Sequence, residues 1–214
     1  MSVAEGQLAL GADTCAVAFT QLHAIQRHAA ARHVNVGIAV RPDLELRILE
    51  ERHAPDVFSL VDHDRAYLRQ WLTWVDTTKA EADTLAFIRE SLHKFSSGDA
   101  ITAGIWHHNR LAGVIGTVNY ARHWRKVEIG YWIAEASQGN GLVTDSCRAL
   151  VTHLFTELDL NRVEIHCAVS NSKSAAVPRR LGFQLEGTLR EANFAAGRFH
   201  DVCVFGMLKR DWHA

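Results

Sequence analysis

No apolar run in the sequence approaches the roughly 20 residues that a helix needs to cross a bilayer. The first residues also lack the arrangement of a secretory signal, in which a charged start precedes an apolar core and a cleavage site. We therefore expect a soluble, cytoplasmic protein that makes no contact with a membrane.

An excess of charge of either sign is absent as well. The chain has 23 Lys and Arg against 24 Asp and Glu, which gives a formal net charge of -1. Proteins that bind nucleic acid neutralise phosphates with clustered basic residues, and no such excess exists here. The composition therefore favours a small-molecule or protein substrate and excludes nucleic acid as the expected partner.

Cysteine is scarce, and no two cysteines form a CxxC pair. Three of the four fall inside segments with the pattern of a helix or strand, so buried free thiols in a reducing compartment explain them best. They are Cys15, Cys147, Cys167 and Cys203.

Metal-binding motifs are also missing, although the chain has 13 histidines. There is no HExxH motif, and His23, His28 and His33 recur every five residues, a spacing that does not place them on one helical face. We predict that the protein has no metal site.

The length of 214 residues suits one α/β domain with a substantial core. An Ala/His-rich stretch gives way to patterned sequence near residues 36–42, so we assign residues 1–40 to an N-terminal extension and residues 41–214 to the domain. Residues 14–42 contain no acidic residue, a faint resemblance to an organelle transit peptide, but an ordinary or partly ordered N-terminal extension explains this stretch better.

Hydrophobic periodicity predicts alternating helices and strands within the domain. Apolar residues at a spacing of three to four, such as Leu85, Ile88 and Leu92, indicate helices, and shorter β-rich runs bounded by turn residues indicate strands. Helices are expected near residues 54–61, 65–74, 78–95 and 142–158, with a short one ending at Gly182. Strands are expected near 44–49, 101–106, 111–120, 127–134, 162–169, 183–191 and 199–208.

A loop with two glycines separates a predicted strand from the helix that begins near Leu142. Gly139 and Gly141 lack a Cβ, so the backbone can turn sharply and direct its N–H groups, with the positive end of the helix, toward a pyrophosphate. A tight turn without a ligand explains the glycines equally well. A dinucleotide fingerprint is disfavoured because Thr144 stands where it needs a third glycine, and no Gly-Lys-Ser/Thr sequence of an NTPase P-loop occurs.

The motifs along the chain resemble the GNAT superfamily of acetyltransferases, and its RimJ/RimL-type branch in particular. The loop sequence from Gln138 to Val143 is similar to the acyl-CoA signature of the family, Gln/Arg-x-x-Gly-x-Gly/Ala, although Val143 replaces the final small residue. Further stretches follow in the family's order: residues 130–133, 161–165, 171–183, 185–187 and 197–201.

This resemblance implies an α+β fold with a mixed, mostly antiparallel sheet of about seven strands, a central splay and four to five helices. It also implies that acetyl-CoA, or another acyl-CoA, is the co-substrate and lies in the gap between two central strands. A backbone N–H near Ile133 is then the expected donor to the oxyanion of the tetrahedral intermediate. The implied cofactor-binding residues are Ile133, Ala134, Gln138, Gly139, Asn140, Gly141, Leu142, Val143, Asn171 and Ser174.

Two residues are the candidates for acid and base catalysis. Many members of the family protonate the departing thiolate with a tyrosine, but Pro178 stands at that position here, and Ser174 matches the serine that takes this role in the RimL-type pattern. Ser174 and Asn171 could instead serve only the start of a helix. Glu128 lies among apolar strand residues, where burial would fit it to accept a proton, but an exposed position or a structural ion pair explains it equally well.

The resulting hypothesis is an enzyme that moves the acetyl group of acetyl-CoA to a primary amine, with the N-terminal α-amine of a protein as the expected acceptor. One alternative is an acetyl- or succinyltransferase that acts on an amino acid, a polyamine or an antibiotic. Another is an acyl-CoA-binding module without catalysis, because the usual tyrosine is missing at Pro178. The resemblance is also compatible with a homodimer.

Overall fold

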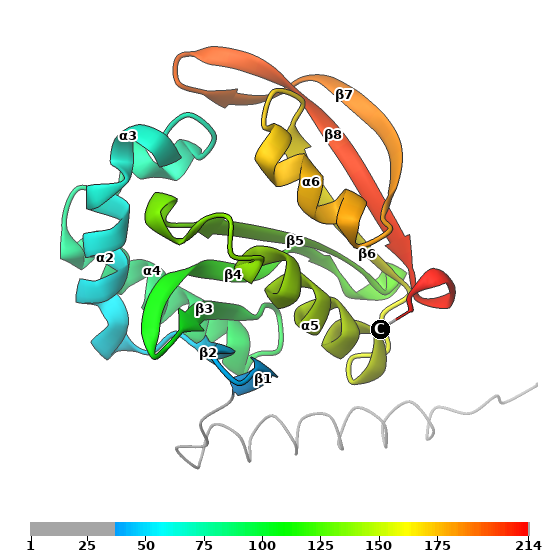
Figure 1. Ribbon diagram of the computed structural model, residues 1–214, viewed down its shortest axis with the longest axis horizontal. Coiled ribbons are helices and arrows are strands. Elements are labelled where there is room, and N and C mark those ends of the chain that lie inside the picture. The colour runs from blue at the N-terminus through cyan, green and yellow to red at the C-terminus, as the bar shows by residue number, and fades with distance from the viewer. Residues whose placement is uncertain (1–36, 214) are drawn as a thin grey trace, which may run out of the picture. The chain divides into compact units, whose positions relative to one another are not determined.

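The structure, a computed structural model, describes residues 37–213, so Cys15 and the predicted extension histidines His23, His28 and His33 lie outside the described residues. This part contains one sheet of eight strands in the order β1-β2-β3-β4-β5-β6-β8-β7, drawn with its helices in Figure 1. The strands are β1 (Gly37–Arg41), β2 (Leu44–Ile48), β3 (Thr102–His107), β4 (Arg110–Ala121), β5 (Lys126–Ile133), β6 (Arg162–Ala168), β7 (Gln184–Ala195) and β8 (Arg198–Leu208). The α-helices are α2 (Ala54–His63), α3 (Arg65–Leu68), α4 (Glu81–Ser96), α5 (Leu142–Thr156) and α6 (Ser172–Arg180).

The sheet opens at its centre between β5 and β6. All neighbouring strands are antiparallel except this pair, which is parallel and matches only Lys126–Glu128 with Arg162–Glu164. Both strands continue beyond this short ladder, to Ile133 and Ala168. They therefore separate toward their carboxyl ends, which confirms the expected α+β fold with a central splay.

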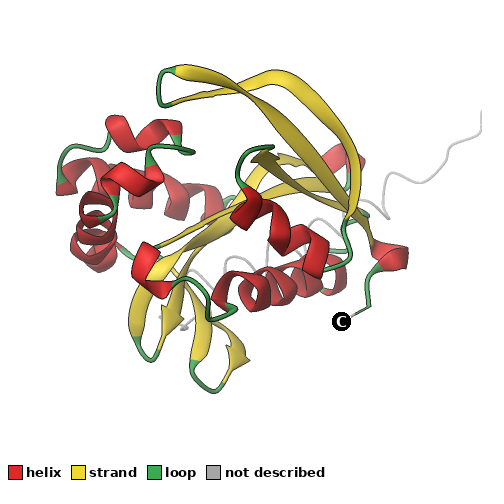
Figure 2. Ribbon diagram, turned by 45° about the horizontal axis from the view of Figure 1, so that its top comes forward, coloured by secondary structure: helices red, strands yellow, loops and turns green. Residues whose placement is uncertain are grey.

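The helices cover the two faces of the sheet and bury two apolar clusters. Consecutive residues of β4 point to opposite faces, and Ile115 joins the larger cluster with α5 and α6, whereas Val114 joins the smaller one with α2 and α4. Figure 2 shows these two groups of helices against the sheet. None of the helices in residues 37–213 is long and apolar enough to span a membrane.

The periodicity of the sequence predicts the central helix well. Leu142, Leu150 and Leu154 are each 1% exposed and recur on the face of α5 that packs on the sheet. The spacing of three to four residues that predicted this helix is thus the spacing of its buried side chains.

Two elements differ from the prediction. The sheet has eight strands rather than about seven, because residues 37–41, which were assigned mostly to the extension, pair with β2 as an edge strand. The helix expected over residues 65–74 ends at Leu68, and a separate 3-10 turn covers Thr73–Asp76. The apolar residues of this segment are buried on both sides of the break, Leu68 at the end of α3 and Val75 in the 3-10 turn.

Candidate active site

The loop between β5 and α5 has the backbone conformation that its glycines predicted. A 3-10 turn, Glu135–Ser137, follows the strand, and Gly139 and Gly141 then take φ values of 83° and 73°, in the left-handed region that side chains disfavour. Gly141 is the N-cap of α5 and has no side chain to bond the helix start. The first N–H groups of α5 therefore remain available for an anion at the positive end of the helix.

A cavity of about 770 Å³ lies in front of this loop. It is bordered by the end of β5, the loop and first turn of α5, the start of α6, and the segment around α3. Its lining residues include Tyr67, Leu68, Trp71, Leu72, Tyr131, Trp132, Ile133, Gln138, Gly139, Gly141, Leu142, Val143, Asp145, Asn171, Lys173, Ser174 and Arg180.

The structure brings together eight of the ten predicted cofactor-binding residues in the lining of this cavity: Ile133, Gln138, Gly139, Gly141, Leu142, Val143, Asn171 and Ser174. The other two, Ala134 and Asn140, do not line it. Ala134 is 4% exposed and its N–H donates to the Ala112 carbonyl. The Asn140 side chain is exposed and donates to the carbonyls of Ser137 and Gln138.

The backbone N–H of Ile133 faces the gap between β5 and β6. Opposite residues in an antiparallel ladder alternate between pairs that exchange hydrogen bonds and pairs that do not. Ala134 bonds Ala112 at 2.8 Å, and Ile133 opposes Gly113 at the next step, so its N–H points away from β4. On the other side β5 pairs with β6 only as far as Glu128, which leaves this N–H without a partner strand.

Ser174 lies at the start of α6 in a hydrogen-bonded group with Asn171 and Tyr131. The Asn171 side chain caps the helix, because its Oδ1 accepts the Ser174 N–H at 3.0 Å. The Tyr131 hydroxyl donates to the Ser174 carbonyl at 3.0 Å, and the Ser174 hydroxyl donates to the Tyr131 oxygen at 3.3 Å. Burial raises the pKa of Tyr131, so its hydroxyl keeps its proton and remains a donor.

Glu128 lies in an ion network on β5 and does not line the cavity. Its carboxylate accepts a bond from the Asn119 side chain at 2.9 Å and lies 3.5 Å from His166 Nδ1. His166 Nε2 is 3.1 Å from the Glu164 carboxylate. This geometry matches the ion-pair alternative, and a role for Glu128 as the base stays a prediction.

Three functional candidates were missed by sequence reasoning: Tyr131, Lys173 and Arg180 all line the cavity. Lys173 Nζ donates to Gln138 at 2.7 Å and Arg180 donates to Thr144 at 3.2 Å, so both cations lie against the glycine loop or the first turn of α5. Lys173 and Arg180 are seven residues apart on α6, a spacing that puts them on one helical face. This spacing is a signal that could have found them.

The sequence of the chain is similar to those of known acetyltransferases. A family model described as an acetyltransferase (GNAT) domain matches residues 43–184. The chain is 37% identical over 175 residues to YdaF of Bacillus subtilis (strain 168), a match that covers 81% of this chain and 95% of YdaF. It is 31% identical over 171 residues to the ribosomal-protein-serine acetyltransferase of Escherichia coli (strain K12), covering 80% of this chain and 96% of that enzyme.

The fold of the chain is similar to those of solved acetyltransferase structures. RimL, a ribosomal L7/L12 α-N-protein acetyltransferase in complex with coenzyme A, matches with a TM-score of 0.79 and 33% identity, covering 80% of this chain and 97% of RimL. The microcin C7 self-immunity acetyltransferase MccE, in complex with acetyl-CoA and AMP, matches with a TM-score of 0.77 and 25% identity, covering 80% of this chain and 96% of the MccE chain.

Proposed function

The chain belongs to the GNAT acetyltransferase family and is an N-acetyltransferase, and we propose that its acceptor is the N-terminal α-amine of a protein. The observation that carries the proposal is the extent of the match to enzymes that act on ribosomal proteins, which covers about four fifths of this chain. Matches to spermidine N(1)-acetyltransferases extend over less than half of it. A polyamine is therefore the second candidate and not the first.

The acyl-CoA is proposed to bind along the loop and into the splay. Free N–H groups at the start of α5, together with Lys173 and Arg180, offer positive charge to the pyrophosphate. The pantetheine arm then enters the gap between β5 and β6. There it can form hydrogen bonds with the unpaired backbone of Ile133, as a neighbouring strand would. The exposed Asn140 supports this site by holding the loop conformation.

Acyl transfer needs a neutral amine, a donor to the oxyanion and a proton for the thiolate. We propose that the amine attacks the thioester carbon while the Ile133 N–H stabilises the oxyanion. The C–N bond forms, the C–S bond breaks, and Ser174 gives its proton to the departing sulfur. The proton that the amine loses returns to Ser174 through water before the next turnover. The hydrogen bond with the protonated Tyr131 orients Ser174 for this step.

Glu128 is the proposed acceptor of the proton that the amine loses. Its carboxylate does not line the cavity, so water must carry this proton along the gap between the strands. Its side chain is 17% exposed, so the residue is not fully closed to such water.

We propose that the reaction proceeds without a metal. Within residues 37–213, one group of side chains, Asp43, His107 and His108, brings possible ligand atoms within 4.8 Å of one another. The guanidinium of Arg41 already lies 2.8 Å from the Asp43 carboxylate. A fixed positive charge at this distance opposes a cation at the same carboxylate.

A cytoplasmic location and a homodimer are also proposals. Cys147, Cys167 and Cys203 are buried and unpaired, as suits thiols in a reducing compartment. Burial raises the pKa of Cys167 to about 11, so this thiol keeps its proton. The strand β7 forms an edge of the sheet and exposes Leu185 and Leu189 to about half. A second copy of the chain would cover this edge.

The decisive experiment measures release of the CoA thiol from acetyl-CoA with a panel of acceptors. We expect turnover with a peptide that carries a free N-terminal α-amine and none with the same peptide blocked at its N-terminus. Faster turnover with spermidine, free amino acids or aminoglycosides would establish the small-molecule alternative, and succinyl-CoA tests the acyl group. Tight CoA binding without thiol release for any acceptor would show a binding module instead.

A further inference from the structure

An acidic residue lies where the proposed function places the pyrophosphate of acyl-CoA. Asp145 is in the first turn of α5 and lines the cavity next to Gly141. Its side chain is 35% exposed. A carboxylate here benefits from the positive end of the helix, but it also competes with a bound anion for that charge and repels it.

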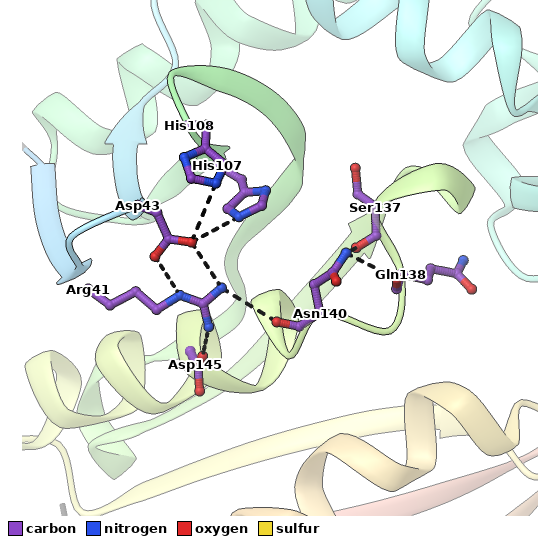
Figure 3. A network of polar contacts seen from close by, with 8 residues as sticks. All are labelled: Arg41, Asp43, His107, His108, Ser137, Gln138, Asn140 and Asp145. Carbon is purple, nitrogen blue, oxygen red and sulfur yellow. Dashed lines mark hydrogen bonds and ion pairs between the residues drawn. The ribbon is translucent and has the colours of Figure 1, made fainter.

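The strand β1 supplies the cation that offsets this carboxylate. Arg41, the last residue of β1, donates from Nη1 to Asp145 Oδ2 at 2.5 Å. Its Nη2 reaches the Asn140 backbone carbonyl at 3.5 Å, inside the glycine loop. Figure 3 shows the guanidinium between the first turn of α5 and the loop residues.

A second group of residues fixes the orientation of Arg41. Asp43 Oδ1 accepts its Nε at 2.8 Å, and Asp43 Oδ2 is in turn 3.0 Å from His107 Nε2. The turn that carries Asp43 is tied to the next hairpin, because the His108 N–H donates to the Asp43 carbonyl at 2.8 Å. The guanidinium is therefore held on one side by two hairpin turns and presents its other side to Asp145.

We propose that Arg41 is a positioning residue of the acyl-CoA site, which neutralises Asp145 and holds the Gly139–Gly141 loop so that the loop binds the pyrophosphate. The inference rests on the proposed function, since it assumes that acyl-CoA occupies the cavity. Arg41 precedes the residues 43–184 that match the family model. It acts through Asp145 and the loop and does not itself line the cavity.

A purely structural role for the ion pair between β1 and α5 predicts the opposite change in CoA binding for one variant, Asp145→Asn. If the ion pair only holds the two elements together, Arg41→Gln and Asp145→Asn break the same bond and weaken CoA binding alike. If Arg41 neutralises Asp145, the two changes have effects of opposite sign, because Asp145→Asn removes the charge that repels the pyrophosphate.

The test is a set of calorimetric titrations of CoA into the full-length protein and its variants. We expect Arg41→Gln to weaken CoA binding about tenfold and Asp145→Asn to strengthen it about threefold, and the double variant should recover to within about twofold of the unchanged protein. The loss in Arg41→Gln should shrink at high salt, because screening weakens repulsion between partly exposed charges.

Two controls separate charge at the loop from general effects. Arg89→Gln removes the same charge from α4, where Arg89 pairs with Glu51 and does not line the cavity, and should leave CoA binding unchanged. With acetylpantetheine, which has no pyrophosphate, the KM of Arg41→Gln should equal that of the unchanged protein.

Equal weakening in Arg41→Gln and Asp145→Asn, with no recovery in the double variant, would overturn the proposal in favour of a structural tie. Failure of the unchanged protein to bind CoA is a distinct result, which would refute the proposed function itself. If Arg41→Gln does not fold, the sign of the Asp145→Asn effect still decides between the two forecasts.

Discussion

At the scale of single residues, Ser174 is the side chain on which the proposed proton transfer depends. Ser174→Ala removes the hydroxyl that would protonate the thiolate but keeps the backbone N–H that Asn171 caps, so α6 should still form. We expect kcat to fall roughly 100-fold, as is typical when a general acid is lost, with little change in the KM for acetyl-CoA. Steady-state thiol release measures both constants.

The matched control is Ser172→Ala, since Ser172 is an exposed residue in the same first turn of α6. It should behave like the unchanged enzyme. A kcat for Ser174→Ala equal to that of this control would remove Ser174 from the mechanism and leave it as a helix residue.

Ser174 could be predicted as a site residue from the sequence, and its partner Tyr131 could not. Ser174 follows Asn171 at the spacing of an N-cap and its N3 residue, and the family resemblance supplied its role. Tyr131 is separated from Ser174 by 43 positions, and its hydroxyl meets α6 only once β5 and α6 pack together. A contact of this kind depends on tertiary packing, which no local pattern encodes.

At the scale of elements, the end of β5 is positioned by close contact with β4. A Cβ added to Gly113 would overlap the Trp132 carbonyl oxygen and lie 2.8 Å from the Ile133 Cα. Gly113→Ala must therefore push the two strands apart at the proposed oxyanion donor. We expect a loss of about 1–3 kcal/mol in the free energy of unfolding, as for other overpacked sites, and a lower kcat, measured by urea denaturation and thiol release.

Gly130→Ala is the control in the same strand pair. The nearest atom to its added Cβ is the end of the Val118 side chain, at 3.4 Å, which is ordinary contact with a group that can move. This variant should keep its stability and activity. If Gly113→Ala is as stable and active as Gly130→Ala, the close approach of the strands does not position Ile133.

The elements that were predicted well have strong local signals. The apolar spacing of α5 and the turn residues that bound the predicted strands depend on neighbours in sequence. In contrast, β1 is a short edge strand with no fully buried residue, and only Ile38 and Val40, at alternate positions, pack against the core, so the pattern is too short to predict a strand. The segment after α3 is apolar because the 3-10 turn buries Val75, and periodicity alone could not distinguish this turn from a longer helix.

At the scale of the whole molecule, the resemblance predicted a mixed, mostly antiparallel sheet with a central splay, but the order of its strands was not predicted. The insertion of β8 between β6 and β7 is a long-range pairing, and Arg162 joins it by bonding Glu164 on its own strand and Glu186 on β7. Strand periodicity predicts that each segment is extended but not which segments are neighbours. The separation of β5 and β6 likewise becomes visible only in the assembled sheet.

The stability of the whole fold should decrease as the pH falls below about 6.5. Burial lowers the pKa of His53 and of His153 below the ordinary value of 6.5. The folded protein therefore keeps both imidazoles neutral at a pH where the unfolded chain takes up protons. Their contribution to stability is complete above pH 6.5 and is lost as the pH falls through and below this value.

Urea denaturation at pH 7.5 and pH 5.5 measures this effect, and we expect a lower midpoint at pH 5.5. The carboxylate of Glu164 titrates outside this pH interval. Burial alone would raise its pKa, but hydrogen bonds from Arg162 and Lys126 hold the pKa below the ordinary value of 4.5. His153→Gln removes one of these two titrating groups, the half-buried one, and should reduce the difference between the midpoints, whereas the exposed His123→Gln should not. Equal midpoints at both values of pH in the unchanged protein would contradict the assignment, because two histidines with lowered pKa values require a loss on acidification.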